Sequence, residues 1–321
     1  MKAIILPKSG TIDNIKLREI EKPVSKNGEI LVKVDYCGVN HLDLLIISGK
    51  RQTSGFPLVL GSEIAGIRTD TNEKVAVYPW TFCGACEQCK SGCENICDKG
   101  GAIGRTRQGG FAEYTSVPKK NLVKIPDNID SKLICASTLS ACTALHMIKR
   151  VDIPDKATVL INGATGGVGT AAIQILKNKK CKIIARTTHK EKAKTLKNLG
   201  ADTVLINEYP QSVPYIIDAM GGNVWSESIE RLSKNGTIVF CATTLEEQGV
   251  VNIGRAFARQ LNILGSYGGT IEDLKEVIDF VRKGVIKPVI DSVYKLEDVP
   301  EALKKLNEQK AFGKILIKCN A

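Results

Sequence analysis

The chain has 321 residues, of which 43% are hydrophobic and 25% are charged, so it is long enough for two domains of ordinary globular composition. The formal net charge is +11, but the basic residues are scattered, and the lack of a concentrated basic stripe argues against a nucleic-acid partner. No apolar run approaches the roughly 18 residues of a membrane span, and residues 1–6 are typical of an opening strand rather than a signal peptide. We therefore expect a cytoplasmic protein without a membrane partner.

Residues 1 to about 135 consist mainly of short strands and turns. Residues 29–36 mostly alternate between apolar and polar side chains, which predicts a half-buried strand. Residues 37–43 predict a turn that opens a short helix, residues 56–66 an extended stretch, and residues 109–114 a glycine turn leading into a further strand. This part is predicted to be irregular β structure with few long helices.

The pattern changes after Pro126, because Lys132 to Lys149 is predicted to be helical and strands then alternate with helices. The expected strands are Thr158–Asn162, Lys182–Ala185, Thr203–Ile206, Tyr215–Asp218, Thr237–Cys241 and Asn262–Gly265. Such alternation favours a parallel sheet covered on both faces. A helix from Ile271 to Lys283 and a final strand from Lys314 to Lys318 remain. If the sheet closes near Ser266, this tail returns to the first domain, which is then discontinuous.

The strand at Thr158–Asn162 leads into a glycine-rich turn and then into a helix. The order strand, glycine turn, helix is typical of the first unit of a dinucleotide-binding fold, although a glycine cluster alone also fits an ordinary tight turn. Gly166 and Gly167 let the backbone approach a pyrophosphate, and Gly169 lets the helix pack closely on the strand. The predicted cofactor-binding residues of the turn are Gly163, Ala164, Thr165, Gly166, Gly167, Val168 and Gly169.

The second strand of this unit indicates which dinucleotide binds. In NAD enzymes that strand usually ends in an acid that binds the adenosine ribose, whereas here Arg186 follows Ala185. A guanidinium and hydroxyls favour a 2′-phosphate, so the sequence predicts NADPH rather than NADH. The expected phosphate-binding residues are Arg186, Thr187, Thr188 and Lys192. The alternative is that Arg186 only faces solvent.

Five of the eleven cysteines lie between positions 83 and 97. Four thiolates at Cys83, Cys86, Cys89 and Cys97 suit a tetrahedral structural zinc, so we expect one structural zinc per chain. Cys93 is a fifth candidate ligand. The alternative is a surface lobe of reduced, unligated cysteines.

Motifs along almost the whole chain resemble those of the medium-chain dehydrogenase/reductase superfamily. They are Gly38-Val39-Asn40 with Asp43, residues 60–66, the cysteine lobe, residues 109–114, residues 162–169, residues 199–202, Asp218 and residues 313–315. The resemblance implies an α/β fold, with a Rossmann doubly wound parallel sheet at 136–266 and a discontinuous, mainly β GroES-like catalytic domain at 1–135 and 267–321. It also implies an active site in the cleft between these domains, and a homodimer or homotetramer.

Zinc-dependent members of this superfamily hold a catalytic zinc with a Cys, a His and a second Cys. The resemblance puts Asn40, Ser62 and Leu139 at those three positions, and these residues are poor ligands or none. The remaining potential stand-in ligands are Cys37, His41, Glu63 and Cys142.

The Gly-Val-Asn motif and the glycine turn look more like the zinc-independent quinone oxidoreductase and enoyl reductase branch. The tyrosine that this branch often uses as proton donor is missing, because Gly49-Lys50-Arg51 stands in its place. The resulting hypothesis is an NADPH-dependent oxidoreductase that transfers hydride to a small-molecule substrate, an activated alkene or a quinone, without a catalytic zinc.

In this hypothesis Asn40 polarises the acceptor carbonyl, while Asp43 and Glu63 orient the site. The nicotinamide is expected near Thr143, Gly265, Ser266 and Asn40, and Ala242 is a further predicted cofactor-binding residue. Two alternatives stay open, namely a zinc alcohol dehydrogenase with altered ligands and a non-catalytic NADPH-binding protein.

Overall fold

The structure is a computed structural model, and it describes residues 1–320. The chain forms two compact units, which are described separately below. Unit 1 contains residues 1–139, residues 270–282 and the chain from Pro288 onward, and unit 2 contains residues 140–269 and 283–287. Unit 1 is therefore discontinuous in sequence. Within residues 1–320, no helix combines the length and the hydropathy that a membrane crossing requires.

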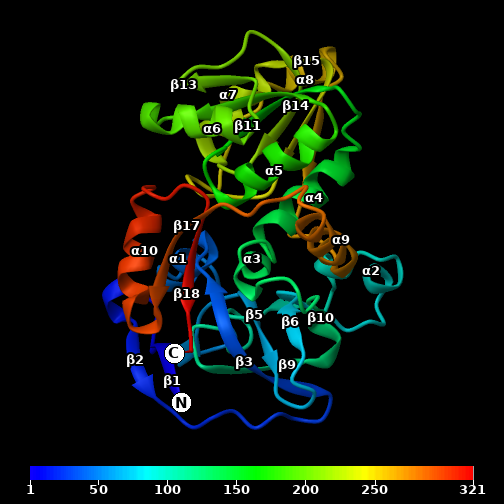
Figure 1. The fold of residues 1–321 in the computed structure, drawn as a ribbon. Helices are drawn as coiled ribbons and strands as arrows, with labels where there is room; N and C mark the ends of the chain where they lie inside the picture. Colours follow the sequence, from blue (N-terminus) through cyan, green and yellow to red (C-terminus); the bar gives the residue numbers. More distant parts are fainter. Residues whose placement is uncertain (321) are drawn as a thin grey trace. The chain divides into compact units, whose positions relative to one another are not determined.

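Unit 2 is built on a six-stranded parallel sheet in the order β13-β12-β11-β14-β15-β16 (Figure 1). Its strands are β11 (Thr158–Asn162), β12 (Lys182–Thr187), β13 (Thr203–Ile206), β14 (Val213–Asp218), β15 (Leu232–Phe240) and β16 (Asn262–Gly265). All six were predicted, several with the same bounds. The first strand in sequence, β11, lies inside the sheet, and the strand order reverses beside it. Such a switch point is where doubly wound folds bind nucleotides.

Helices cover both faces of this sheet, which is why its strands are apolar on both sides. The helices are α4 (Ser140–Val151), α5 (Gly167–Asn178), α6 (Ala193–Leu199), α7 (Gly222–Ile229) and α8 (Ile253–Ala258), with a 3-10 turn η4 at Lys190–Lys192. Leu160 on β11 packs with Ile229 on α7. Val159 and Ile161, its buried neighbours, point to the opposite face because side chains alternate along a strand.

The helix predicted from Lys132 to Lys149 is in fact two helices, α3 (Ser131–Cys135) and α4. Ser137 and Thr138 close the first helix by donating their hydroxyl protons to the carbonyls of Leu133 and Ile134, at 3.0 and 2.8 Å. The amide of Leu139 then donates to the carboxylate of Glu63 instead of continuing a helix. The single-helix prediction was wrong because a distant side chain uses this amide.

Unit 1 contains three antiparallel or mixed sheets (Figure 1). A three-stranded sheet has the order β2-β1-β4, a seven-stranded sheet has the order β10-β6-β5-β3-β18-β17 with β9 also paired to β3, and β7 pairs with β8. The strands are β1 (Lys2–Leu6), β2 (Lys16–Glu19), β3 (Glu29–Gly38), β4 (Leu58–Val59), β5 (Glu63–Arg68), β6 (Lys74–Val77), β7 (Trp80–Thr81), β8 (Gly101–Ala102), β9 (Tyr114–Pro118), β10 (Leu122–Lys124), β17 (Ile290–Lys295) and β18 (Lys314–Lys318). One apolar core joins the first two sheets.

The helices of unit 1 are short, apart from two in its C-terminal part. They are α1 (His41–Ile47), α2 (Glu87–Lys90), α3, α9 (Ile271–Arg282) and α10 (Val299–Asn307), with 3-10 turns η1 (Ile12–Asn14), η2 (Glu94–Ile96), η3 (Lys119–Asn121) and η5 (Leu296–Asp298). The sequence predicted α9 and β18 but missed β17 and α10 between them.

The last strand is inserted beside one of the first. β18 pairs antiparallel with β3, with Leu316 opposite Gly38 and Ile317 opposite Cys37. The amide of Val39 also donates to the carbonyl of Ile315 at 3.0 Å. This pairing brings the start of β18 to the segment between β3 and α1, where the polar centre of unit 1 is built.

Candidate active site

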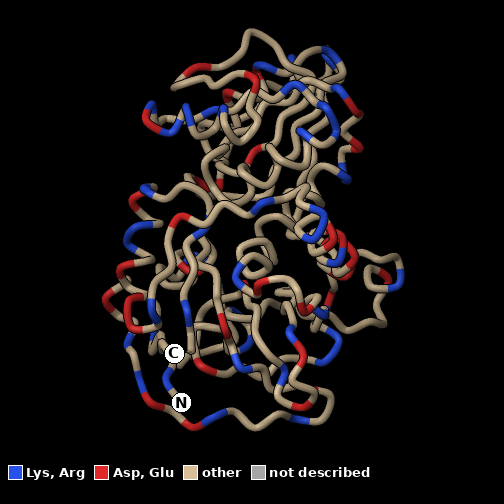
Figure 2. The backbone as a smooth tube through the Cα atoms, in the orientation of Figure 1, with Lys and Arg blue, Asp and Glu red and all other residues tan. Residues whose placement is uncertain are grey.

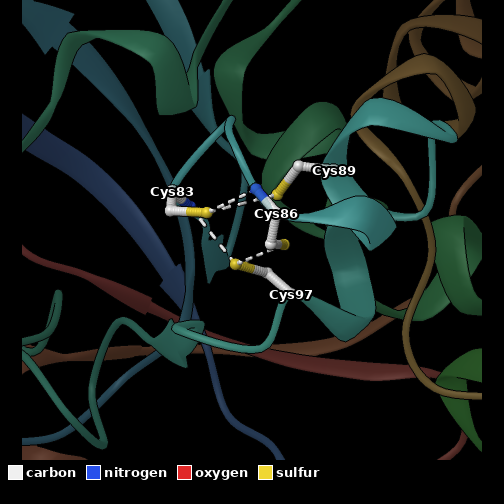
Figure 3. Close-up of side chains that lie close together, drawn as sticks. All are labelled: Cys83, Cys86, Cys89 and Cys97. Carbon is white, nitrogen blue, oxygen red and sulfur yellow. Dashed lines mark hydrogen bonds between the residues drawn. The ribbon is translucent and has the colours of Figure 1, made fainter.

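The four cysteines of the predicted metal site come together in a lobe of unit 1 (Figure 3). Their sulfur atoms all lie within 4.8 Å of one another, with Cys83 and Cys89 at 3.9 Å and Cys86 and Cys97 at 3.8 Å. Within residues 1–320, no other group of three or more His, Cys, Asp or Glu side chains gathers in this way. Cys93, the fifth candidate, is not part of the cluster.

Backbone amides donate hydrogen bonds to two of the four sulfurs. The amides of Ala85 and Cys86 both donate to Cys83 Sγ at 3.3 Å, and the amide of Gly84 donates to Cys89 Sγ at 3.3 Å. The amides of Ala85 and Cys86 lower the pKa of the Cys83 thiol to about 6. Four converging cysteine sulfurs form a closed donor set for a tetrahedral ion, so the lobe fits a structural zinc.

The lobe also holds the start of α9. The carboxylate of Glu94, which lies on η2 between Cys93 and Cys97, accepts a hydrogen bond of 2.6 Å from the amide of Ile271. This amide is one of the four at the N-terminus of α9 that lack a partner inside the helix. The conformation of the cysteine lobe is therefore linked to the point where the chain re-enters unit 1.

Glu63, the first residue of β5, is the centre of a buried polar cluster in unit 1. Its side chain is fully buried, and Oε1 accepts from the Leu139 amide at 2.9 Å. Oε2 accepts from Asn40 Nδ2 at 3.2 Å and lies 2.6 Å from the ammonium of Lys314. Gly38 has to be a glycine here, because a Cβ at that position would meet the Glu63 carboxylate.

Lys314 supplies the positive charge of this polar centre. Besides Glu63, its ammonium donates to the carbonyl of Val39 at 2.9 Å and to Asn40 Oδ1 at 2.7 Å. The lysine side chain is 6% exposed. All three of its protons are therefore used, and the ion pair is neutralised and satisfied as a buried pair requires.

Asn40 and Asp43 fix the start of α1. Both protons of the Asn40 amide group are engaged, one by Gly38 O at 3.1 Å and the other by Glu63. Asp43 accepts from the amides of Asn40 and Gly61, at 2.8 and 3.2 Å, and burial raises its pKa to about 7. The expectation that Asn40 polarises an acceptor does not fit this geometry, because its amide group has no donor to spare.

The three positions that the resemblance assigns to catalytic zinc ligands do meet. Asn40 and Leu139 both donate to Glu63, and Ser62 is its neighbour in sequence. Their side chains are an amide, an aliphatic group and a hydroxyl, which is not a donor set for zinc. The Ser62 hydroxyl is fully buried and makes no hydrogen bond.

The stand-in ligands do not supply the donors that a catalytic zinc would need in place of these three residues. Glu63 already has three partners, and none of Cys37, His41 and Cys142 is in a metal-binding cluster within the described residues. Burial raises the pKa of the Cys37 thiol well above its ordinary value, which disfavours the thiolate that a metal requires. Burial lowers the pKa of His41 to about 4, and the nearby Lys314 charge adds to this effect.

The glycine turn of unit 2 has the geometry that its sequence predicts. Gly163 has φ of +72°, and the amide of Gly166 donates to Gly163 O at 3.1 Å. A Cβ on Gly169 would lie 2.5 Å from Ala164 Cα, so only glycine lets α5 start this close to β11. The turn therefore presents the N-terminus of α5 at the switch point of the sheet, where a pyrophosphate is favoured.

The residues predicted to bind a 2′-phosphate lie at the end of β12. The Arg186 guanidinium lies over the ring of Tyr209 at 4.1 Å, and its Nε is buried without a hydrogen-bond partner. Thr187 is buried and leaves the sheet on the opposite face from Arg186, since neighbouring strand residues alternate. Thr188 is exposed, and Lys192 is buried at the end of η4.

The residues expected near the nicotinamide come from three elements of unit 2. Thr143 is buried on α4, and Gly265 ends β16. Ser266 continues this edge, with its amide donating to Phe240 O at 2.8 Å and its hydroxyl buried without a partner. Ala242 follows β15, and its carbonyl lies against Gly221. These side chains are small, as the approach of a planar ring requires.

Comparisons with known proteins agree with this arrangement. The family described as Alcohol dehydrogenase GroES-like domain matches residues 26–127, and the family described as Zinc-binding dehydrogenase matches residues 167–283. An NAD-dependent alcohol dehydrogenase of Sulfolobus acidocaldarius is 31% identical, with 99% of each chain covered. The chain belongs to the medium-chain dehydrogenase/reductase superfamily.

Other members of the superfamily extend the comparison. An acryloyl-coenzyme A reductase of Sulfurisphaera tokodaii is 28% identical, over 99% of this chain and 100% of the relative. A solved structure of a thermostable alcohol dehydrogenase from Pyrobaculum aerophilum is 32% identical, with a TM-score of 0.94 and 99% of each chain covered. This medium-chain dehydrogenase/reductase is thus an NAD(P)H-dependent oxidoreductase with a zinc-binding cysteine lobe.

Sequence reasoning did not place Lys314 in the polar centre of this dehydrogenase, although it recognised the motif around it. The available signal was a lysine at the first position of an otherwise apolar strand, since lysine is almost never fully buried without a partner. Tyr209 was also missed, because no local pattern shows that it lies under Arg186.

Proposed function

We propose that the protein is an NADPH-dependent reductase that transfers hydride to an activated alkene, with an enoyl thioester as the favoured acceptor and a quinone as the second. The observation that carries this proposal is the polar centre around Glu63. The three ligand positions of zinc alcohol dehydrogenases meet there, but they hold Asn40, Ser62 and Leu139. A Lys314–Glu63 ion pair supplies the local charge.

NADPH as the cofactor is supported by the end of β12. Arg186 stands where an NAD-binding acid is usual, and its buried Nε still lacks an acceptor. A phosphate oxygen is a strong acceptor for such a group. When it is bound, the reduced nicotinamide supplies the hydride.

The remaining catalytic work falls to positioning and to one hydrogen bond. Hydride addition to the β-carbon of an enoyl thioester develops negative charge on the thioester oxygen, which a donor in a dry site stabilises. Asn40 and Lys314 have no donor left, whereas the Ser62 hydroxyl is buried without a partner. We assign Ser62 as that donor, with solvent as the source of the proton that completes the reduction.

The test is NADPH oxidation measured with crotonyl and acryloyl thioesters, with quinones, and in reverse with simple alcohols and NADP⁺. We expect turnover on the thioesters, and one zinc per chain in metal analysis. Ser62→Ala is expected to lower kcat about 10- to 100-fold, since loss of one oxyanion donor costs about 100- to 1000-fold where the donor is optimally placed. A matched control is Ser116→Ala, a hydroxyl of the same unit on β9 that bonds to Glu29.

A zinc alcohol dehydrogenase with altered ligands is the second candidate, and the 31% identity to an alcohol dehydrogenase favours it. Two zinc ions per chain together with brisk alcohol oxidation and no alkene reduction would establish this candidate and overturn the first.

A further inference from the structure

Two neighbouring loops of unit 1 carry basic side chains and no acidic ones. They are residues 48–62, between α1 and β5, and residues 100–112, around β8 and before β9. Their charged residues are Lys50, Arg51, Arg105 and Arg107. Figure 2 marks the lysines and arginines along the backbone, which are also dense at residues 177–197 of unit 2. These segments, the basic loops, thus form a local excess of positive charge.

The basic loops are joined to each other by side-chain hydrogen bonds. Ser54 Oγ donates to Thr106 O at 3.0 Å. Gln108 accepts from the Val59 amide at 2.6 Å and donates to Pro57 O at 3.1 Å. The two segments are therefore held against each other rather than being independent loops.

This surface adjoins the polar centre. A Cβ on Gly104 would lie 2.9 Å from the backbone of Gly61, so the second loop rests directly on the residue before Ser62. The amide of Gly110 also donates to Gly61 O at 2.8 Å. The loops that carry Lys50 and Arg105 are therefore in contact with the backbone next to Ser62.

The basic side chains of these loops differ in their partners. Arg107 is paired with Glu29, which also accepts from Ser116. In contrast, the Arg105 side chain makes no hydrogen bond or ion pair within residues 1–320, although its Nε is buried. Lys50 is exposed and likewise has no acidic partner among the described residues. A buried donor without an acceptor is rare in folded proteins and indicates an absent partner.

We propose that Lys50 and Arg105 bind the phosphates of a coenzyme A thioester, and that the carrier rather than the acyl group gives this substrate much of its affinity. Guanidinium and ammonium groups are the usual partners of phosphate oxygens. Phe56 lies in the same loop with 41% of its surface exposed, and it offers an aromatic face for the adenine. A quinone has no phosphates and would gain nothing from these residues. This inference rests on the proposed reduction of enoyl thioesters.

The test compares two thioesters of the same acyl group, crotonyl-coenzyme A and the crotonyl thioester of N-acetylcysteamine, which lacks the phosphates. In wild type we expect a lower KM for the coenzyme A ester, with an advantage that shrinks as salt rises from 50 to 500 mM. Arg105→Gln should raise the KM for that ester about tenfold, equivalent to about 1.4 kcal/mol. Lys50→Gln should raise the KM for the coenzyme A ester roughly threefold, because an ion pair formed by an exposed lysine contributes little binding free energy.

Neither substitution should change kcat, the KM for the truncated thioester or the KM for NADPH by more than about twofold. Lys16→Gln on β2, an exposed lysine outside the basic loops, is the matched control and should have no effect. Retained turnover of the truncated thioester shows that each variant is folded.

Each of the following results would overturn the inference. An unchanged KM for the coenzyme A ester excludes a phosphate contact, and an equal loss for both thioesters points to the acyl end. A raised KM for NADPH alone assigns the basic loops to the phosphates of the cofactor. If wild type reduces both thioesters with the same KM, this inference fails but the proposed function stands. If wild type reduces neither thioester, the proposed function fails as well.

Discussion

Replacing Lys314 by methionine tests the ion pair at the polar centre, because it removes the charge and keeps an unbranched side chain. The ammonium lies 2.6 Å from Glu63 Oε2 and donates to Val39 O and Asn40 Oδ1. Its loss leaves a fully buried carboxylate with two neutral donors and no counter-charge. Removing one partner of such a pair costs about 3–5 kcal/mol, which we expect as the loss in free energy of unfolding of unit 1.

The double variant separates charge from packing. Glu63→Gln combined with Lys314→Met leaves no buried charge, and neutral replacements of whole buried pairs are often tolerated. We expect the double variant to be more stable than Lys314→Met by at least about 2 kcal/mol, which is a coupling that independent sites would not show. Lys124→Met is the matched control, because its pair with Glu73 is exposed and worth less than about 1 kcal/mol.

The measurement uses the two tryptophans of the chain, since Trp80 lies in unit 1 and Trp225 in unit 2. In a Trp225→Phe background, fluorescence during guanidinium unfolding reports on unit 1. A loss below about 1 kcal/mol for Lys314→Met, or a double variant no more stable than the single one, would refute the role given to the ion pair.

Three further predictions concern the metal, the cofactor and the assembly. Cys89→Ser, or chelation of zinc, should lower thermal stability and speed hydrogen exchange of the first turn of α9, which Glu94 holds, and unchanged exchange there would contradict the link. Arg186→Asp should shift the ratio of kcat/KM for NADPH over NADH at least about tenfold toward NADH, and an unchanged ratio would show that Arg186 does not bind the phosphate. We also propose a homodimer through unit 2, because β16 pairs on one side only within the described residues and α8 exposes Ile253 and Phe257 by 74% and 75%. Phe257→Glu should therefore halve the mass in light scattering, and a wild-type monomer would exclude this interface.

The parts that the sequence predicted well depend on residues that are close together in the chain. The glycine turn and its flanking strand and helix are one continuous segment, and the zinc ligands fall within residues 83–97. The spacing of residues that are close in sequence was therefore enough to predict almost the whole arrangement of the glycine turn and of the four cysteines. The parallel sheet followed in the same way, because each strand has its own apolar run.

The polar centre could not be predicted, because its members are far apart in sequence. Lys314 reaches Asn40 across 274 residues, and the Leu139 amide reaches Glu63 across 76. Both contacts depend on the register of β18 against β3 and on the break between α3 and α4. The register depends on which strands pair in the folded protein, and this pairing between distant segments cannot be derived from a single sequence. For the same reason the sequence did not predict the contacts of Asn40, since Gly38 O and Glu63 engage its two donors and sequence reasoning did not place Glu63 beside it.

The charge balance of the polar centre is an argument for the proposed reduction of an alkene rather than oxidation of an alcohol. Alcohol oxidation needs an alkoxide, and a zinc ion stabilises such an oxyanion by lowering the pKa of the bound hydroxyl. Lys314 is the only cation shown at this centre within residues 1–320, and its three protons are held by Val39, Asn40 and Glu63. It cannot move to an alkoxide without leaving Glu63 buried and unpaired. Reduction of an enoyl thioester places the charge on a delocalised enolate, for which one hydrogen bond from a group such as Ser62 is a smaller demand. Lys314 thus neutralises Glu63 and, because all its protons are engaged, is not available to stabilise an alkoxide.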